Sequence, residues 1–244
     1  MKRIFKGIIG ISLCSIMLLS FVACEKSTKD NNLKTEDQIK VGGYITLGQY
    51  EQDNDTSNGK EDIEWLVLDI QDNKVLLISK HLIDTQPFER NLDGAFASEI
   101  MPVWENCSLR KWLNNTFLNT AFSPSEQDRI ITTTVSADPN PEESRLDPGN
   151  ATSDKIFLLS MLEAKRYFKT NADRVAFPTA YAIANGGRKY QQEYWLRTPA
   201  GSWGCIALVS YKNYEPHDVS NKYYESCNRD DIMVRPVMWI EIEP

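Results

Sequence analysis

W-E-N-C-S-L-R-K-W-L-N, at residues 104–114, is the stretch that decides the fold, because it opens an amphipathic helix that carries bulky side chains. Apolar residues recur at i, i+3, i+4 and i+8, which places them on one helical face; they are Leu109, Trp112, Leu113 and Phe117. We expect apolar strands on either side in sequence, and a later segment around Trp195, to cover this face. These residues specify packing rather than a reaction.

Two apolar runs precede the helix, at residues 64–69 and 74–79, and residues 71–73 between them have a typical hairpin-turn composition. Because these runs are almost continuously apolar, they predict central strands that are covered on both faces. A further strand is expected at 43–48. Residues 80–103 contain prolines and a glycine and are expected to form a long loop.

Helix-start signals follow the central helix. Capping boxes at residues 123–126 and 160–163 each predict a helix start, and a helix over 178–184 is expected to stop at Asn185-Gly186-Gly187. Later strands are predicted at 130–135, 155–159, 194–199, 205–209 and 234–240. The order of strands, helices and strands predicts one α+β domain of antiparallel sheets with short helices.

The first 23 residues have the pattern of a secretory signal peptide. Lys2, Arg3 and Lys6 precede an apolar run at 7–22, which falls below the roughly 20 residues that a membrane-spanning helix requires. L-S-F-V-A-C at 19–24 resembles a bacterial lipoprotein cleavage box. That resemblance implies that Cys24 carries the lipid, such as palmitate, and becomes the new N-terminus; cleavage without lipidation is the alternative.

The polar residues after the signal cannot offset the entropy of ordering, so 24–40 are predicted to form a lipidated cysteine and a flexible tether. Residues 41–244 are then long enough for a single domain with a hydrophobic core. The expected location is the extracytoplasmic side of the cell membrane, where the domain is held by its lipid.

The charge balance is acidic. Without the signal the chain keeps 24 of its 27 basic residues and all 34 acidic ones, a net charge of −10. This balance argues against nucleic acid as a partner and against electrostatic adhesion to anionic lipid.

Three cysteines remain after Cys14 is removed with the signal and Cys24 is lipidated. Cys205 and Cys227 flank one irregular stretch and are the expected disulfide pair, whereas Cys107 at the start of the central helix is expected to be a small buried hydrophobe. That all three are reduced is the alternative.

Five motifs in order resemble a bacterial extracytoplasmic domain of unknown function (domain of unknown function 6273), which is common in lipoproteins and surface proteins. They are I-E-W-L-V-L-D at 63–69, the 104–114 stretch, T-S-D-K-I-F-L-L-S at 152–160, W-L-R-T-P at 195–199 and V-R-P-V-M-W-I at 234–240. The last two are also similar to the ending of C-type-lectin-like domains, including the formylglycine-generating enzyme group. This similarity implies that the first and last strands pair and that a long loop region carries any site.

Aromatic residues concentrate in the last third of the chain. Five tryptophans lie in apolar periodic runs and are expected in the core: Trp65, Trp104, Trp112, Trp195 and Trp239. Trp203 lies outside such runs and, with four tyrosines, predicts an aromatic surface on which a sugar ring or peptide could stack. The four tyrosines are Tyr211, Tyr214, Tyr223 and Tyr224. A loop that buries its own aromatics is the alternative.

The acidic stretch at 53–64 has oxygen-bearing residues at the spacing of a calcium loop: Asp53, Asp55, Ser57, Glu61 and Glu64. Asn58, however, replaces the glycine needed at the turn, and no flanking helix is predicted. We therefore interpret the stretch as a solvated hairpin loop and assign no metal site.

Arg197 and Arg235 lie among apolar residues beside prolines. They are expected to be core arginines that pair with an internal acid such as Glu64 or Asp69.

Signals for catalysis are few, because only His81 and His217 are present and no metal-ligand spacing, nucleophile motif or phosphate-binding loop occurs. We expect no cofactor. The favoured hypothesis is a non-catalytic module that binds a glycan or another cell-envelope component through the loops of its last third. The alternative is a cell-envelope enzyme with Cys205 or Cys227 as a reactive thiol.

Overall fold

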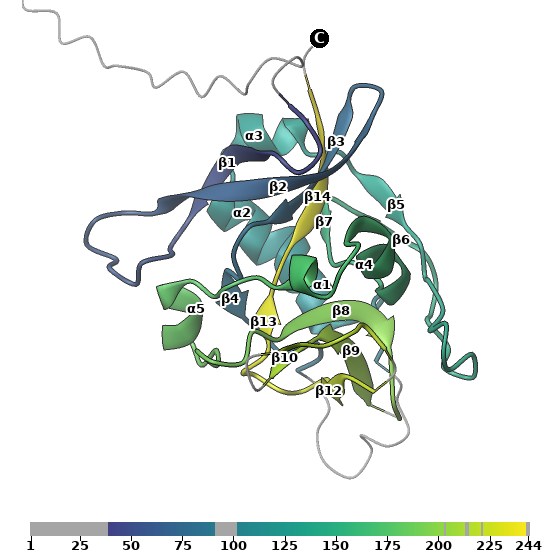
Figure 1. Ribbon diagram of the computed structural model, residues 1–244. Helices are drawn as coiled ribbons and strands as arrows, with labels where there is room; N and C mark the ends of the chain where they lie inside the picture. Colours follow the sequence, from purple (N-terminus) through teal and green to yellow (C-terminus); the bar gives the residue numbers. More distant parts are fainter. Residues whose placement is uncertain (1–38, 91–101, 203, 213–214, 221, 243–244) are drawn as a thin grey trace, which may run out of the picture. The chain divides into compact units, whose positions relative to one another are not determined.

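The computed structural model (Figure 1) describes residues 39–90, 102–202, 204–212, 215–220 and 222–242. Its two larger sheets are connected by two segments of the chain, each of which contributes one strand to each sheet. β3 (Lys74–Ser79) leads into β4 (Asp84–Thr85), and β13 (Met233–Val234) leads into β14 (Val237–Glu241). β3 pairs with β14, and β4 pairs with β13, both antiparallel. Pro236 lies at the bend, where its carbonyl accepts a hydrogen bond from the Ser79 amide at 3.0 Å. Because proline has no N–H, it interrupts the ladder there.

The first sheet has the order β1-β2-β3-β14-β7, with β1 at Tyr44–Tyr50, β2 at Glu61–Gln71 and β7 at Ile156–Phe157. Its strand pairs are all antiparallel. β2 and β3 are interior strands, as their continuous apolar runs predicted. The turn between them places Asp72 at a φ of 52°, a conformation that aspartate tolerates better than most residues do.

The second sheet has the order β12-β9-β8-β13-β4, with β8 at Tyr194–Pro199, β9 at Cys205–Val209 and β12 at Tyr224–Ser226. It contains a parallel pairing, between β13 and β8. Two small hairpins complete the strands: β5 (Thr133–Val135) with β6 (Thr152–Asp154), and β10 (Tyr211–Lys212) with β11 (Glu215–Pro216). The predicted single α+β domain with mostly antiparallel sheets is confirmed.

One expectation from the lectin-like similarity is wrong, because the first and last strands do not pair. β1 lies at an edge of the first sheet, and β14 lies between β3 and β7. The physical reason is burial: β1 alternates between exposed and buried residues, as an edge strand can, while Val237, Met238 and Ile240 of β14 are fully buried.

The central helix is continuous but changes pitch. α1 (Ser108–Trp112) is followed by a π-helical turn at Leu113–Phe117 and by α2 (Leu118–Ala121). The side chain of Cys107 caps its start by accepting from the Arg110 amide, and Cys107 is buried as predicted.

Aromatic contacts cover this helix largely as predicted. Phe122, at its end, packs on Trp65 of β2 with ring centroids 6.1 Å apart. Phe88 lies 6.2 Å from Trp104 and 6.0 Å from Trp195, and so connects the start of the central stretch to β8. The late segment around Trp195 therefore does help to enclose it.

The shorter helices begin at the predicted caps. α3 (Pro124–Arg129) and α4 (Met161–Tyr167) both have complete capping boxes, and a 3-10 turn spans Ala172–Arg174. α5 (Ala180–Ala184) ends where the Gly187 amide bonds the Ala182 carbonyl at 2.9 Å. Among the residues that the structure describes, none of the helices has the length and hydrophobicity needed to cross a membrane.

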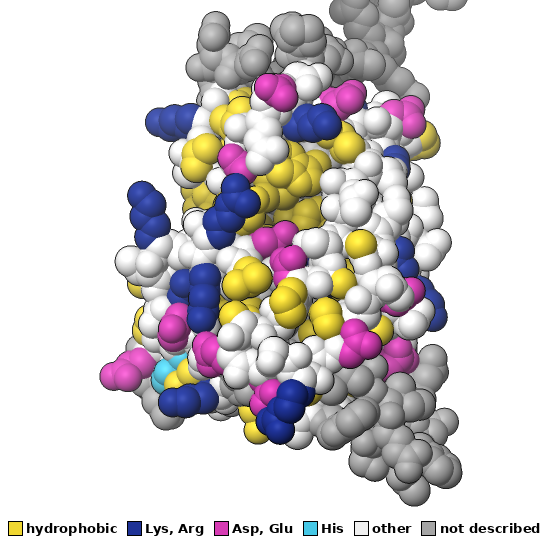
Figure 2. Space-filling view, turned by 90° about the vertical axis from the view of Figure 1, so that its right-hand side faces the viewer, with side chains coloured by type: hydrophobic (Ala, Val, Ile, Leu, Met, Phe, Trp, Pro, Cys, Tyr) yellow, Lys and Arg dark blue, Asp and Glu magenta, His cyan; other side chains and the backbone are white. Residues whose placement is uncertain are grey.

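Two tryptophans are less buried than predicted. Trp65, Trp104 and Trp195 are core residues, but Trp112 and Trp239 are only half-buried against the core. Figure 2 shows hydrophobic side chains recessed between charged ones on the face where α4, β5 and β6 lie, with basic and acidic side chains interspersed. Apolar side chains therefore remain visible at the surface on this face.

Candidate functional site

The predicted aromatic surface centres on Tyr224, in the edge strand β12. The residue is 39% exposed, and its ring lies against the turn between β8 and β9, where a Cβ built on Gly201 would fall 2.4 Å from ring carbons of Tyr224. Besides this lack of space for a Cβ, Gly201 has a φ of +70°, a backbone conformation that favours glycine. We call Gly201 and Tyr224 together the Tyr224 platform: an aromatic ring backed by a glycine and open to solvent.

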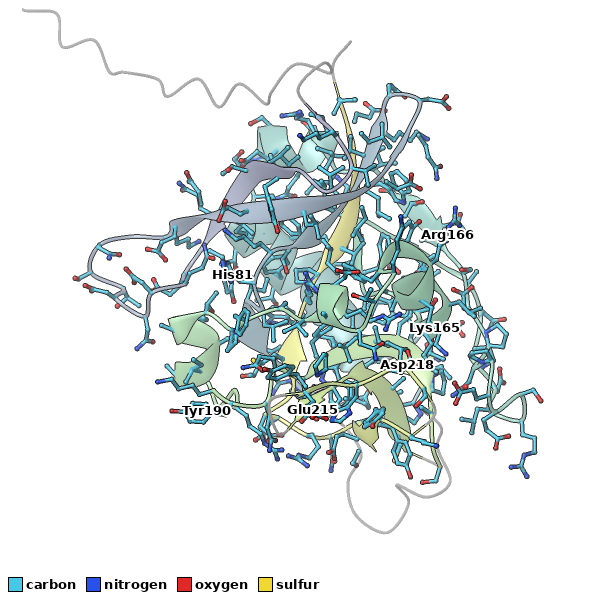
Figure 3. The ribbon with its side chains drawn as sticks, viewed as in Figure 1. His81, Lys165, Arg166, Tyr190, Glu215 and Asp218 are labelled. Carbon is cyan, nitrogen blue, oxygen red and sulfur yellow. The ribbon has the colours of Figure 1, made fainter. Side chains whose placement is uncertain are left out.

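Tyr223, the neighbouring residue, has a different role. Its ring packs partly against the core and stacks on His217, with centroids 4.7 Å apart and planes inclined by 17°. Tyr211 is half-buried in β10. Figure 3 labels Glu215 and Asp218 in this part of the molecule, and places His81 outside it. Of the three predicted tyrosines that the structure describes, Tyr224 is therefore the exposed one.

Several predicted residues lie outside the described part of the chain. They are the signal peptide at 1–23, the lipidation site Cys24, most of the tether at 24–40, and Trp203 and Tyr214 of the aromatic surface. Cys24, Trp203 and Tyr214 therefore stay predictions from the sequence.

Cys205 begins β9 and Cys227 directly follows β12, and both are free thiols in the structure. Ser226 of β12 is directly opposite Cys205 of β9, and the Cys227 amide bonds the Gly204 carbonyl at 2.9 Å. The two residues of the predicted pair thus lie at neighbouring ends of β9 and β12, and the disulfide itself stays a prediction.

The environment of the thiols bears on the enzyme alternative. Burial raises the pKa of Cys227 to about 12, and that of Cys107 to about 12. A nucleophilic cysteine needs a depressed pKa and a nearby base. Within the described residues the hydrogen-bond neighbour of the Cys205 sulfur is the Ser202 hydroxyl at 3.8 Å, whereas His81 meets the Phe177 carbonyl and His217 stacks on Tyr223.

Arg197 is a core residue, as predicted, but with other partners. It is 3% exposed, pairs with Asp138 at 3.1 Å and with Glu163 of α4, and donates to the Leu158 carbonyl at 2.7 Å. It therefore fixes α4 and the 136–138 segment onto β8.

Arg235 is buried without a carboxylate among the residues described. It donates to the carbonyls of Ser79 at 2.9 Å and Arg174 at 3.0 Å. Its guanidinium lies over the rings of Phe168 and Tyr194, at 5.4 and 5.3 Å. Carbonyl oxygens and aromatic faces thus replace the ion pair as its stabilising partners.

The predicted acid partners of these arginines are wrong. Glu64 is bound to Lys80 at 2.5 Å, and the Asp69 carboxylate accepts from the Ile70 amide. Both acids lie on β2, and the partners that they have there are not the two arginines.

The acidic hairpin between β1 and β2 holds a cluster that sequence reasoning missed in part. Glu51, Asp53 and Glu61 each place a carboxylate oxygen within 4.8 Å of the others. Burial and the charge of Glu61 raise the pKa of Glu51, whereas hydrogen bonds from Asn58 and the Asp55 amide lower that of Asp53. Glu51 precedes the calcium-like spacing; its position two residues before Asp53, at the end of a strand, was the available signal.

Comparison with models of protein families identifies a domain family. A family model described as Domain of unknown function (DUF6273) matches residues 72–242, which include four of the five motifs quoted above. No curated protein and no solved structure matches the chain. Because the family model matches more than half of the chain, the chain belongs to this family of domains of unknown function.

Proposed function

We propose that the chain is a lipid-anchored, extracytoplasmic protein whose domain binds a glycan or another cell-envelope component without catalysing a reaction. The anchor is assigned to Cys24, from the signal pattern at 1–23 and the L-S-F-V-A-C box. The polar tether to residue 40 would hold the domain above the membrane.

The observation that carries the binding proposal is the Tyr224 platform. Tyr224 is 39% exposed and its phenol ring is backed by Gly201, which supports a role as a stacking surface. A positioned aromatic side chain offers contact area at a small cost in conformational entropy, and the face of a sugar ring suits it. Trp203, two residues after Gly201, belongs to the same proposed surface.

Charge supports the choice of ligand class. The predicted mature chain has a net charge of −10, and both signs are interspersed on the face seen in Figure 2. A neutral or weakly charged glycan suits such a protein better than a nucleic acid does. The raised pKa of Cys227 favours this binding role over a thiol enzyme.

An array of glycans and peptidoglycan fragments probed with the purified chain tests the proposal. We expect at least one class of fragment to be retained by the unmodified chain and lost by Tyr224→Ala. Tyr190→Ala is the matched control, because Tyr190 is 66% exposed but lies on the segment before β8. Retention of no fragment, or equal retention by Tyr224→Ala and the unmodified chain, would contradict it.

A further inference from the structure

Three carboxylates meet at the base of the β1–β2 hairpin. Glu51 directly follows β1, Asp53 begins the loop, and Glu61 is the first residue of β2. One oxygen of each lies within 4.8 Å of the other two. Calcium binds oxygen at about 2.3–2.6 Å, so ligands on opposite sides of one ion lie about 4.8 Å apart. A single ion can therefore reach all three side chains.

Glu51 gives this cluster a feature that ordinary surface acids lack. The residue is only 9% exposed, and its Oε1 atom is shielded from solvent and has no hydrogen-bond partner. An unpartnered buried carboxylate oxygen is costly unless a proton or a cation compensates it. The carboxylate that carries this atom is also the one that meets Asp53 and Glu61.

The described chain supplies no cation to the cluster. Across the described ranges, none of the three carboxylates forms an ion pair with a lysine or arginine. Lys60, the nearest basic residue in sequence, donates instead to the Thr120 carbonyl at 2.6 Å. The negative charges thus remain uncompensated by side chains.

Backbone and amide donors hold two of the acids in place. Glu61 accepts through Oε2 from the amides of Gln52 at 2.7 Å and Asp53 at 3.3 Å. The Asp53 carboxylate accepts from the Asn58 side chain at 2.8 Å. Because these donors fix one oxygen of Glu61 and orient Asp53, the arrangement is preorganised rather than a chance approach of flexible side chains.

We propose that Glu51, Asp53 and Glu61 bind one Ca²⁺ ion at the base of the β1–β2 hairpin. An all-carboxylate set without histidine or cysteine suits a hard cation rather than zinc or copper. Ca²⁺ is favoured over Mg²⁺ because Mg²⁺ demands near-ideal octahedral geometry and gives up its water shell reluctantly. With three protein carboxylates and water completing the shell, we expect a dissociation constant of about 0.1–1 mM.

This ligand set differs from the linear calcium-like spacing in the sequence. Glu64 belongs to that spacing but binds Lys80 at 2.5 Å. Asp55 also belongs to it, and its carboxylate accepts from the amide and hydroxyl of Ser57. Asp55 and Glu64 are therefore matched controls on the same hairpin.

Thermal unfolding of the purified full chain, stripped with a chelator, tests the site. We expect 10 mM Ca²⁺ to raise the melting temperature by about 3 °C or more, because an ion bound only by the folded state stabilises it. Equal Mg²⁺ should give a smaller rise. Glu51→Gln and Glu61→Gln should abolish the calcium shift, whereas Asp55→Asn and Glu64→Gln should keep it.

Terbium luminescence provides a measurement that does not depend on variants. Tyr50 adjoins Glu51 in sequence, so Tb³⁺ bound at the cluster should be sensitised and then displaced by Ca²⁺. Absence of both a calcium shift and displaceable luminescence in the unmodified chain would overturn the proposal. Loss of the shift in Asp55→Asn and Glu64→Gln would overturn it too, by placing the ion in the linear loop.

Discussion

At the scale of the residue, Arg235 shows how the core accommodates a charge without a counter-charge among the described residues. Its hydrogen bonds go to two backbone carbonyls and to the Tyr194 hydroxyl at 3.2 Å. The V-R-P motif predicted a buried arginine, but it could not reveal that the partners are carbonyls brought from Ser79 and Arg174. Such partners carry no sequence signature, because every residue has a carbonyl.

Arg235→Met should destabilise the protein strongly. The substitution keeps much of the volume but removes the arginine donor from the buried Ser79 carbonyl and one of the two donors from the Arg174 carbonyl, which keeps the Tyr194 hydroxyl, at a cost of about 2 kcal/mol or more. Urea denaturation measures the loss. Arg145→Met is the control: this side chain is 86% exposed beside Glu143, and we expect the free energy of unfolding to stay close to that of the unmodified chain. Equal losses for the two variants would contradict the role given to Arg235.

At the scale of the element, Asn114 connects the central helix to β7. Its side-chain oxygen accepts from the amides of Lys155 at 2.9 Å and Ile156 at 3.1 Å, while its nitrogen donates to the Ile156 carbonyl at 2.8 Å. Asn114 thus meets the backbone of the edge strand β7 much as another strand would. It lies in the π-helical turn at Leu113–Phe117.

Asn114→Ala should lower the free energy of unfolding by about 2–3 kcal/mol, because it leaves the partly buried backbone groups of Lys155 and Ile156, at the start of β7, without this partner. Asn115→Ala is a matched control in the next position. Asn115 is exposed, and its side chain donates to the Lys111 carbonyl of the same helix, so the loss should stay within about 0.5 kcal/mol. Chemical denaturation of both variants checks the difference, and similar values for the two would disprove the connection.

The elements were largely predictable from the sequence, whereas their pairing was not. Local signals placed the capping boxes at Ser123 and Ser160 and the hairpin at 71–73, since each depends on neighbours in sequence. The π-helical turn and the place of β14 between β3 and β7 depend on contacts between distant segments. For the same reason the calcium-like spacing could be read from the sequence, but the convergence of Glu51 with Asp53 and Glu61 could not.

At the scale of the whole molecule, two five-stranded sheets share the bent strands β3–β4 and β13–β14 (Figure 1). The family match covers both bends, and the acidic hairpin precedes it. The proposed ligand surface and the proposed calcium site thus lie on different sheets: Tyr224 on the second and Glu51 beside the first.

The proposed anchor gives a prediction for the full chain in a bacterial host. With labelled palmitate, we expect the unmodified chain to be labelled and to fractionate with membranes, because the cysteine that follows the signal receives the acyl chain. Cys24→Ala should be unlabelled. Cys14→Ala, which changes a cysteine inside the signal, should remain labelled; label on Cys24→Ala would place the lipid elsewhere.

The central claim is that the Tyr224 platform binds cell-envelope glycan. Co-sedimentation with purified peptidoglycan sacculi, over a range of protein concentrations, tests it most directly. We predict that Tyr224→Ala weakens binding at least about tenfold, equivalent to about 1.4 kcal/mol, as expected for the loss of a stacking aromatic. Tyr190→Ala should bind as the unmodified chain does. Unchanged affinity of Tyr224→Ala, or no sedimentation of the unmodified chain, would contradict the account.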